Sequence, residues 1–333
     1  MNKETLHKWS NFIWYQDNFI GLCLLPFSMI FHDIVRFRRY LYHIGILKKH
    51  KLSVPVIIVG NITVGGTGKT PLTIYIVEQL KRLGYKPGVI ARGYGGESEQ
   101  WPKMVSSDSQ PAIVGDEPLV IIRHCEVPIA VGPDRVTSAK LLLDKTDCNV
   151  IISDDGLQHY SLDRDVEIIV IDGKRRFGNG YSLPSGPLRE AISRIREVDF
   201  LVCNGENAEE GEYPMNVQGS KAINLLTGEQ QSLDYFKNKT CHAVAGIGNP
   251  ERFFSLLDNA GISFLRHPFS DHHDFVQEDF TFDDSNEVLM TEKDAVKCTA
   301  FAQINYWFIP VTASIPEAFT ENLVKKLKEK EHG

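Results

Sequence analysis

Short runs of β-branched residues alternate with stretches of helical spacing through the middle of the chain. The apolar runs, such as VPVIIVG at 54–60 and NVIISDD at 149–155, are nearly continuous, which is typical of parallel strands buried on both faces. The alternation covers residues 54–60, 71–84, 87–94, 118–125, 127–132, 134–144, 149–155 and 166–173. It predicts an α/β fold built on a doubly wound, mostly parallel sheet.

The pattern changes after the apolar run DFLVCNG at 199–205. A polar, acidic stretch, ENAEEGEYP at 206–214, follows it and is typical of a boundary or hinge. Beyond it the spacing predicts a smaller α/β unit, with strands at 241–248, 287–290 and 306–311 and helices at 249–261 and 316–331. We therefore expect three parts: a helical segment at 1–51, a core at 52–205, and a hinge with a smaller domain at 206–333.

The first 51 residues differ from the rest in charge and in aromatic content. They hold eight lysines and arginines against three acids, so this segment carries +5 and the remaining chain −12. Apolar and aromatic residues come first, and the basic clusters RFRRY at 36–40 and KKHK at 48–51 follow. This order is typical of a helix or helical hairpin lying in a lipid interface, with its cations against anionic headgroups. A helix packed on the core, followed by a solvated basic tail, is an open alternative.

The apolar run FIGLCLLPFSMIF at 19–31 bears on whether this segment crosses a bilayer. It has thirteen residues, contains Pro26, and is followed by His32 and Asp33. A spanning helix needs about 20 apolar residues, so we expect this run not to span. No small-residue cleavage site follows the run, which argues against a secretory signal.

Composition narrows the classes of function. A chain of 333 residues with 42% hydrophobic and 24% charged residues is an ordinary globular protein. Its net charge of −7, concentrated after residue 51, argues against nucleic acid as a partner. The six cysteines are scattered without a C-x-x-C pair, so neither zinc nor a disulfide framework is indicated, and we predict a reduced, cytoplasmic protein.

The segment VIIVGNITVGGTGKTPLTIYIVEQL at 56–80 places a glycine-rich turn between a buried strand and a helix, as in a Walker A phosphate loop. The backbone N–H groups of such a turn converge on phosphate oxygens. We expect Lys69 to reach the β- and γ-phosphates and Thr70 to bind Mg²⁺. The strict motif has glycine at position 63, where this chain has Thr63. The expected nucleotide-binding residues are Thr63, Val64, Gly65, Gly66, Thr67, Gly68, Lys69 and Thr70.

Two acids end the predicted strand at 149–155. Asp154 and Asp155 would stand at the carboxyl end of a strand next to the loop strand, where carboxylates reach Mg²⁺ directly or through water. Without the phosphate loop, an ordinary Asp-Asp-Gly turn would be the better interpretation. With the loop present, we expect both acids on the metal side of the site, and which one binds stays open.

Several longer stretches are more distinctive than a generic phosphate loop. They are GNITVGGTGKTP (60–71), ARGYGG (91–96), VGDEP (114–118), VGPDR (131–135), SDDGLQH (153–159), RRFGNGYSLPSGPLRE (175–190), AGIGNPERFF (245–254), DHHDF (271–275) and MTEKDAVK (290–297). Together they cover most of the chain, which resembles the tetraacyldisaccharide 4'-kinase family. The resemblance implies a P-loop NTPase-like core, a smaller hinged C-terminal α/β domain, and an N-terminal helical segment that docks on the membrane.

The same resemblance implies an activity and a location. The enzyme would transfer the γ-phosphate of ATP, with Mg²⁺, to the 4'-hydroxyl of a tetraacylated glucosamine disaccharide 1-phosphate, a late step of lipid A biosynthesis. Its substrate would be an acylated lipid in the membrane, and no obligate protein partner or nucleic acid is expected. It would act as a peripheral or monotopic protein at the cytoplasmic face of the bacterial inner membrane.

Activation of the acceptor hydroxyl is assigned by this resemblance. Asp116 in VGDEP follows a glycine at an expected strand-to-helix turn, and by itself is better interpreted as a helix-capping residue. The resemblance makes Asp116 the general base, paired with His272 of DHHDF, and an imidazole beside a carboxylate suits proton transfer. The two lie far apart in sequence, so closure of the two domains would assemble the site. Zinc is not expected at DHHDF, because adjacent residues rarely point the same way.

Polar and basic residues near these motifs are the candidates for substrate contact. Arg189 is the strongest, because a guanidinium suits phosphate oxygens, and it would orient the acceptor or the γ-phosphate. Gln158 follows the acidic pair by one helical turn and would position the acceptor or metal-bound water. Arg175 and Arg176 are further basic candidates, and for each arginine a solvated surface position is the alternative. The expected substrate-binding set is Arg92, Arg135, Gln158, Arg189 and Glu190.

Two other nucleotide-binding classes are weighed against this prediction. A membrane-associated switch ATPase of the ParA/MinD kind shares a glycine-rich loop, but its signature lysine position is Val64 here. A GTPase needs an N-K-x-D motif, and the nearest string, TEKD at 291–294, lacks the residue between lysine and aspartate. Consumption of ATP that depends on the acceptor would separate these classes from a kinase.

Overall fold

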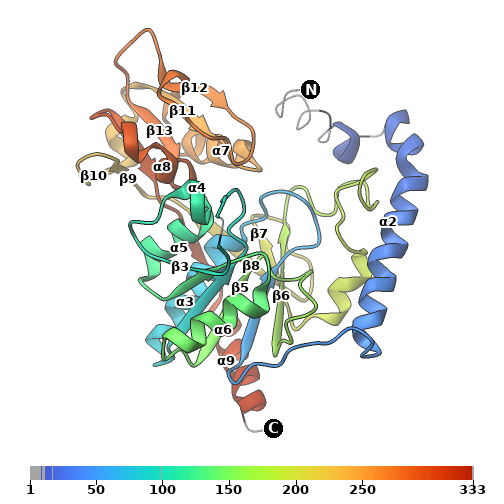
Figure 1. Ribbon diagram of the computed structural model, residues 1–333. Coiled ribbons are helices and arrows are strands. Elements are labelled where there is room, and N and C mark those ends of the chain that lie inside the picture. The colour runs from blue at the N-terminus through green and yellow to red at the C-terminus, as the bar shows by residue number, and fades with distance from the viewer. Residues whose placement is uncertain (1–8, 10–11, 17, 99, 332–333) are drawn as a thin grey trace.

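The centre of the molecule is a nine-stranded sheet, seen in a computed structural model that describes residues 9, 12–16, 18–98 and 100–331 (Figure 1). Across the sheet lie β15 (Thr312–Ser314), β8 (Glu212–Gln218), β7 (Phe200–Asn204), β6 (Val166–Asp172), β1 (Val56–Gly60), β5 (Val150–Asp154), β2 (Pro87–Ala91), β4 (Ile129–Val131) and β3 (Lys103–Val105). The inner strands pair in parallel, and β3 and β15 pair antiparallel at the two edges. The doubly wound, mostly parallel sheet predicted from the sequence is confirmed.

Helices cover both faces of this sheet, and alternate residues of each strand enter the two layers. On β1, Ile57 and Val59 belong to the layer packed by α3 (Lys69–Arg82), α5 (Asp116–Cys125) and α9 (Glu317–Glu331). Val56 and Ile58 belong to the opposite layer, which α6 (Arg135–Lys145) covers. All five residues of β1 are buried, which explains its continuous apolar sequence.

The strand register brings the polar motifs to one edge. Val59 of β1 pairs with Asp154 of β5, so the phosphate loop after Gly60 and the acidic pair leave the sheet side by side. Asp172 at the end of β6 pairs with Asn204 at the end of β7 on the other side of β1. The carboxyl ends of four neighbouring strands therefore supply one site, the usual place for ligands in open α/β sheets.

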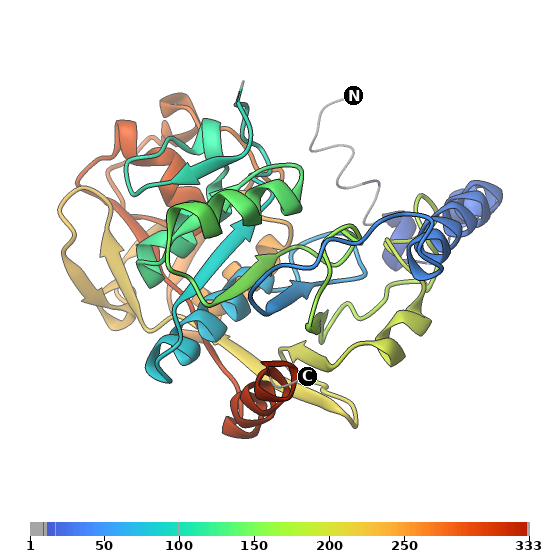
Figure 2. The ribbon, with the colours of Figure 1, turned by 60° about the horizontal axis from the view of Figure 1, so that its bottom comes forward.

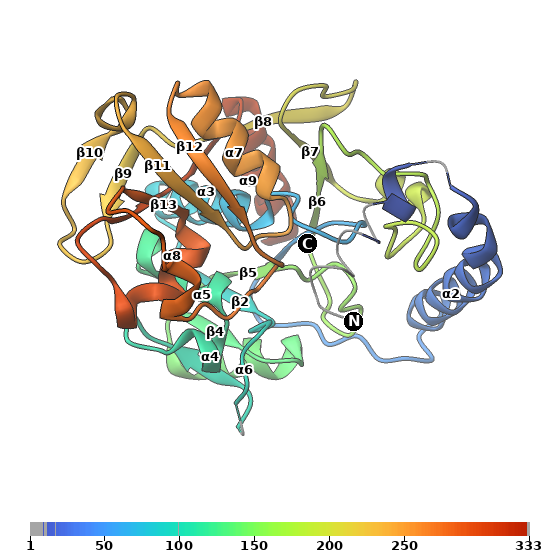
Figure 3. The same cartoon turned by 90° about the horizontal axis from the view of Figure 1, so that it is seen from above.

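A second, six-stranded sheet forms the upper unit in Figure 1. Its order is β10 (Gln230–Ser232), β9 (Lys221–Asn224), β14 (Tyr306–Ile309), β13 (Val288–Thr291), β11 (Thr240–Ala245) and β12 (Ser263–Pro268). Helices α7 (Pro250–Asn259) and α8 (Glu292–Cys298) pack into separate apolar clusters on this unit. Seen from above, the unit lies over the edge of the large sheet where β5 and β2 end (Figure 3).

The division between the two sheets does not follow the expected boundary after residue 205. The acidic stretch is a short connection that leads into β8, which begins within the stretch at Glu212 and pairs with β7 in the large sheet. The chain then builds the second unit and returns, since β15 pairs with β8 and α9 packs in the large core through Phe319, Leu323 and Leu327. Strand pairing over such sequence distances is invisible to a local composition change.

Helix α2 (Phe19–His43) stands at the side of the large sheet in both Figure 1 and Figure 2. One narrow face is packed, and its buried residues are Gly21 and Ser28. The outward side chains are mostly large and apolar, and the exposed ones are Phe19, Ile20, Leu22, Phe27, Met29, Ile30, Ile34, Phe37 and Tyr40. The helix is therefore attached to the core but not enclosed by it.

The prediction that this segment is too short to span a bilayer was wrong as to length. The helix has 25 residues, about 37 Å at 1.5 Å per residue, and runs through Pro26 instead of ending at His32 and Asp33. His32 contacts the Ser182 hydroxyl at 3.4 Å on the packed side, and Asp33 faces solvent, so neither ends the helix. By length and composition α2 could cross a membrane, and only 11% of its most apolar window is buried. It is consistent with association with a membrane.

Candidate active site

The phosphate loop joins β1 to the first turn of α3. Gly68 precedes Lys69, the first residue of α3, with a φ of +99°, and Gly65 has a φ of +105°. A Cβ at Gly68 would lie 2.0 Å from Asn204 Nδ2, which donates a hydrogen bond to the Thr67 carbonyl at 2.8 Å. Both glycines are thus required by backbone conformation, and position 68 also by space.

Thr63 departs from the strict motif for a structural reason. It forms an antiparallel bridge with Leu188, and the neighbouring Val64 N–H donates to the Pro187 carbonyl at 2.8 Å. The Arg189 N–H in turn donates to the Ile62 carbonyl at 2.7 Å. Position 63 therefore lies in a short strand pairing with the segment at 187–189, which a β-branched residue favours over glycine.

The loop lysine and threonine face the acidic pair. Lys69 Nζ lies 3.7 Å from Asp155 Oδ1 and 3.4 Å from Asn61 Oδ1. The hydroxyls of Thr70 and Thr73 donate to the two oxygens of Asp154 at 3.3 and 2.9 Å. The parallel pairing of β1 with β5 produces this arrangement, as the sequence predicted.

The two acids differ in environment. Asp154 is buried, and burial is the main cause that raises its pKa to about 7, with Glu117 adding to the effect. Asp155 has a φ of +48° and points toward Lys69 and Arg189. Burial alone would raise its pKa, but these two cations hold it well below the usual range. Asp155 thus pairs with two cations, while the effect of Lys69 on Asp154 is outweighed by burial.

The oxygen atoms around Asp154 fit Mg²⁺. Thr70 and Asp154 offer hard oxygen ligands, and the raised pKa of Asp154 is the mark of a buried carboxylate that a cation would stabilise. Among the described residues, no cluster of three or more metal-binding acids, histidines or cysteines exists. Mg²⁺ commonly needs only one or two protein ligands when phosphates and water supply the others.

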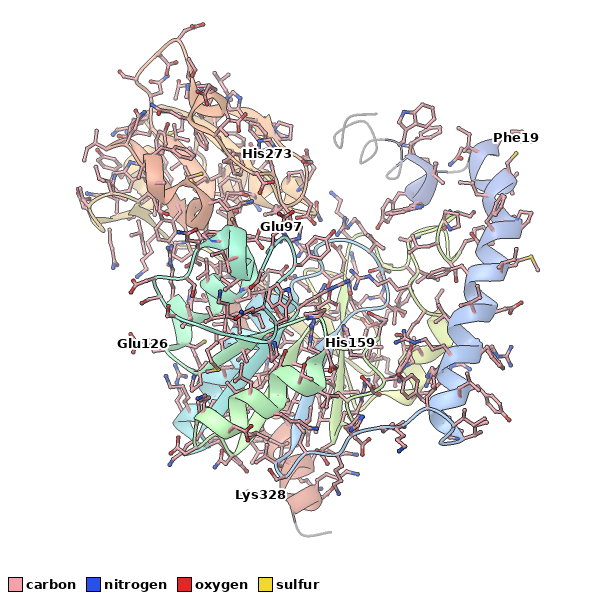
Figure 4. All side chains as sticks on the ribbon, viewed as in Figure 1. Phe19, Glu97, Glu126, His159, His273 and Lys328 are labelled. Carbon is pink, nitrogen blue, oxygen red and sulfur yellow. The ribbon has the colours of Figure 1, made fainter. Side chains whose placement is uncertain are left out.

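Asp116 and His272 meet, although they lie in different units. His272 Nδ1 is 3.1 Å from Asp116 Oδ2, and Asp116 is 4% exposed. Asp116 is the first residue of α5 after Gly115, and α4 (Pro111–Val114) precedes it, so the expected strand-to-helix turn is a helix-to-helix turn. The neighbouring His273 points elsewhere, to Asp279 at 2.8 Å. Figure 4 shows His273 in the upper unit, and Glu97 on the rim of the large unit that faces it.

Two of the predicted arginines lie where a substrate could reach them. Arg189 Nη1 is 3.2 Å from both oxygens of Asp155. Arg92 is exposed, with its guanidinium 5.8 Å from the centre of the Tyr94 ring. The Tyr94 ring also lies 4.6 Å from the His272 ring, so Arg92 and His272 are neighbours of the same tyrosine.

The structure does not support the prediction that the third arginine, Arg135, binds substrate. It is fully buried and donates to the Gly132 carbonyl at 2.7 Å, with the carbonyls of Asp154 and Asp155 at 3.5 Å. Its guanidinium is enclosed and directed at backbone carbonyls at the end of β5, so it is not available to a substrate in this structure. The stretch VGPDR does not show whether its arginine is buried, because the partners at Asp154 and Asp155 lie 19 and 20 residues further along the chain.

Gln158 and Glu190 also face inward. Gln158 Nε2 donates to the Asn61 carbonyl at 3.1 Å and to Glu190 Oε1 at 2.7 Å. Glu190 is 3% exposed and lies 3.5 Å from Arg194. These residues join the phosphate loop to the segment that carries Arg189. The expectation that they contact substrate is therefore not supported by their geometry.

The second unit touches the phosphate loop directly. Arg175 Nη2 donates to the Gly66 carbonyl at 2.9 Å, and its Nη1 donates to the Gly248 carbonyl at 3.3 Å. A Cβ at Gly248 would lie 2.7 Å from Gly66 N. Asp172 accepts from Arg175 and, at 2.9 Å, from Arg252 of α7. Of the residues that make these contacts, Arg175 was a basic candidate from the sequence, whereas Asp172, Gly248 and Arg252 were not predicted as site residues, although Gly248 and Arg252 lie in the distinctive stretch at 245–254.

Comparison with known proteins decides the family. The model of the family described as tetraacyldisaccharide-1-P 4'-kinase matches residues 20–328. The chain belongs to this family. The family and fold predicted from the sequence are therefore confirmed.

Relatives of the tetraacyldisaccharide-1-P 4'-kinase family match over nearly their whole length. A protein named tetraacyldisaccharide 4'-kinase from Nitrosococcus oceani is 47% identical over 316 residues, which is 95% of this chain and 93% of the relative. One of the same name from Methylobacillus flagellatus is 47% identical over 326 residues, covering 97% of each chain. A crystal structure of LpxK from Aquifex aeolicus in complex with ATP superimposes with a TM-score of 0.78 at 30% identity, covering 92% of this chain and 99% of that one.

Proposed function

We propose that this chain transfers the γ-phosphate of ATP to the 4'-hydroxyl of a tetraacylated glucosamine disaccharide 1-phosphate, a late step of lipid A biosynthesis. The observation that carries the proposal is the family match over residues 20–328, in a chain where the phosphate loop, the acidic pair and Arg189 meet at one sheet edge. The name of the relatives supports the acceptor, and the ATP in the Aquifex aeolicus structure supports the donor.

The donor side uses the loop and the acidic pair. Backbone N–H groups of residues 63–68 and the start of α3 would bind the phosphates, with Lys69 at the β/γ-phosphates. Thr70 and Asp154 would hold Mg²⁺, with Asp155 beside them, and the ion would neutralise charge on the phosphate oxygens. Asp155 keeps Lys69 and Arg189 directed toward the same place.

The acceptor side uses residues from both units. Asp116, kept ionised by its cationic neighbours, would accept the proton of the sugar hydroxyl, and His272 would orient Asp116 by donating to it. Arg189 would stabilise the transferring phosphoryl group, and Arg92 would contact the acceptor. Because Asp116 and His272 come from different units, the acceptor would be activated only where the two units lie together.

The location follows from α2 and the substrate. An acylated acceptor stays in a bilayer, and α2 presents its large apolar side chains outward. We place the chain at the cytoplasmic face of the inner membrane, where ATP is available, with Arg36 and Arg38 near anionic headgroups. No protein partner is needed for this arrangement.

The test is transfer of labelled γ-phosphate from ATP to a purified tetraacylated disaccharide 1-phosphate in mixed micelles. Wild type should label the lipid, Lys69→Ala should lose about 100-fold or more of turnover, and Asp116→Asn should lose turnover while keeping ATP affinity. Lys86→Ala, at an exposed pair with Asp147, is the matched control and should behave as wild type. ATP hydrolysis without labelled lipid would favour the switch ATPase instead.

A further inference from the structure

A lysine of the second unit, Lys293 in the first turn of α8, contacts both members of the Asp116–His272 pair. Its Nζ lies 3.3 Å from His272 Nε2 and 3.9 Å from Asp116 Oδ1. It also lies 3.2 Å from Glu117 Oε1 and 3.6 Å from Asp271 Oδ1. Asp116 and Glu117 belong to α5 in the large unit, whereas the other two belong to the second unit. One ammonium group therefore joins both sides of the closed interface.

These contacts determine where His272 carries its proton. An ammonium group only donates hydrogen bonds, so Nε2 is the acceptor in its contact with Lys293, and Asp271 Oδ1, at 3.8 Å from Nε2, lies beyond hydrogen-bond distance. An ionised carboxylate only accepts, so Nδ1 carries the proton and donates to Asp116. Lys293 thus holds the imidazole in the tautomer that donates to Asp116. The φ of +55° at His272 is uncommon outside glycine, and it is the kind of local cost that proteins retain at functional sites.

The charge around Asp116 depends on the same lysine. Burial alone would raise the pKa of Asp116, but Lys293, His272 and Lys297 lower it to about 2. Lys297, one turn further along α8, lies 3.7 Å from Asp116 Oδ2. Burial lowers the pKa of Lys293, but its three carboxylate neighbours outweigh this and raise it above the usual range. Without Lys293, those carboxylates would face one another across the interface with one cation fewer.

We propose that Lys293 is a positioning residue for phosphoryl transfer, which closes the second unit onto α5 and holds His272 as the hydrogen-bond donor to Asp116. The proposal rests on the proposed function, in which Asp116 accepts the proton of the sugar hydroxyl. Lys293 acts through Asp116 and His272, and its loss should impair the closed, reacting state more than the binding of ATP to the phosphate loop.

The experiment compares Lys293→Met and Lys293→Arg with wild type in the labelled-phosphate assay, from about pH 5 to 9. Lys293→Met should keep ATP affinity within about threefold while kcat falls about 100-fold, the scale of a lost proton-transfer contribution. In wild type the acid limb of Asp116 lies below this range, because its pKa is about 2, and in Lys293→Met that limb should rise into the range near pH 5, because removing a nearby cation lets burial raise the carboxyl pKa. Lys293→Arg keeps the charge and should recover about tenfold of the lost rate.

Lys239→Met is the matched control. Lys239 belongs to the second unit, pairs with Glu287 at 2.9 Å, and lies at the far end of β11 from the phosphate loop. It should match wild type in kcat and pH profile. If Lys293→Met does not unfold cooperatively on heating, Lys293→Gln carries the same expectations.

The outcomes separate this proposal from the proposed function. Wild-type kcat and an unmoved acid limb in Lys293→Met would overturn the role of Lys293, and so would equal loss of rate in Lys293→Met and Lys293→Arg. Asp116→Asn in the same assay tests the role of Asp116 itself. If that variant turns over normally, the proposed function of Asp116 fails whatever the Lys293 variants do.

Discussion

Replacing Gly248 by alanine should separate the second unit from the phosphate loop without unfolding either. A Cβ at this position would lie 2.7 Å from Gly66 N and 3.0 Å from Asp271 Oδ2, whereas ordinary contact begins at 3.4 Å. The two units must then move apart by about 0.7 Å at this point. Gly248 does not lie in the left-handed region of backbone conformation, so alanine adds no backbone strain at this position.

The displacement sets the expected size of the effect. A misplacement of about 1 Å at a reacting centre costs roughly 100-fold in rate, so a shift of 0.7 Å should lower kcat/KM for ATP between about 10- and 100-fold. The assay is initial-rate transfer of labelled phosphate at varied ATP, together with thermal melting of the free protein. Melting should change little, because the closer contact, with Gly66 N, arises where the units meet, and the contact within the second unit is with the end of the Asp271 side chain, which can turn away.

A second glycine of the same unit serves as the opposite control. Gly228 has a φ of +74° and open space around it, so Gly228→Ala should cost about 1 kcal/mol of stability through backbone strain and leave kinetics unchanged. Unaltered kinetics in Gly248→Ala would refute the argument, since the contact would then be absent from the reacting enzyme. A large drop in its melting temperature would also refute it, because the clash would then act within the folded unit.

Two further predictions concern the α5–α8 contact and α2. His124 on α5 lies 2.7 Å from Glu292 on α8, and this hydrogen bond raises its pKa above 6.5. The stability that this hydrogen bond contributes should be fully present below pH 6.5 and be lost as pH rises through the folded-state pKa of His124. In denaturant titrations at several pH values, the free energy of unfolding of wild type should show this loss, and that of His124→Gln should not. Replacing both Phe27 and Ile34 by serine should weaken binding to anionic vesicles more than 100-fold in a sedimentation assay. Both side chains are exposed on α2, and burying each in lipid is worth about 2 kcal/mol. Leu226→Ser, at an exposed apolar position of the second unit, is the control and should leave vesicle binding unchanged. Unchanged vesicle binding by the double variant would refute a membrane role for α2.

The fold and the donor side of the site could be predicted because their signals are local. The continuous apolar residues of β1 and β5, the glycines before Lys69, and Asp154 at a strand end each follow from neighbouring residues. To predict that these residues form one site, it was enough to know that the carboxyl ends of parallel strands meet at one edge of a sheet.

What escaped prediction depends on contacts between distant segments. The burial of Arg135 behind β5, the inward turn of Glu190 and the return of β15 to the large sheet all require a partner more than fifteen residues away. The length of α2 was misjudged for a related reason. An apolar run ends where polar residues begin, but a helix ends only where its backbone hydrogen bonds do.

The attachment of α2 has a consequence for how the enzyme meets its substrate. The Ser28 hydroxyl donates to the Ser182 carbonyl at 2.8 Å and accepts from the Ser185 N–H at 2.9 Å. Residues 187–189 then pair with the phosphate loop within a few residues of this contact. In the proposed orientation, these hydrogen bonds between α2 and the segment at 182–185 thus fix the distance of the catalytic groups from the lipid surface. The enzyme would then meet its acceptor by lateral diffusion along the membrane, with its active site at a constant distance from the lipid surface.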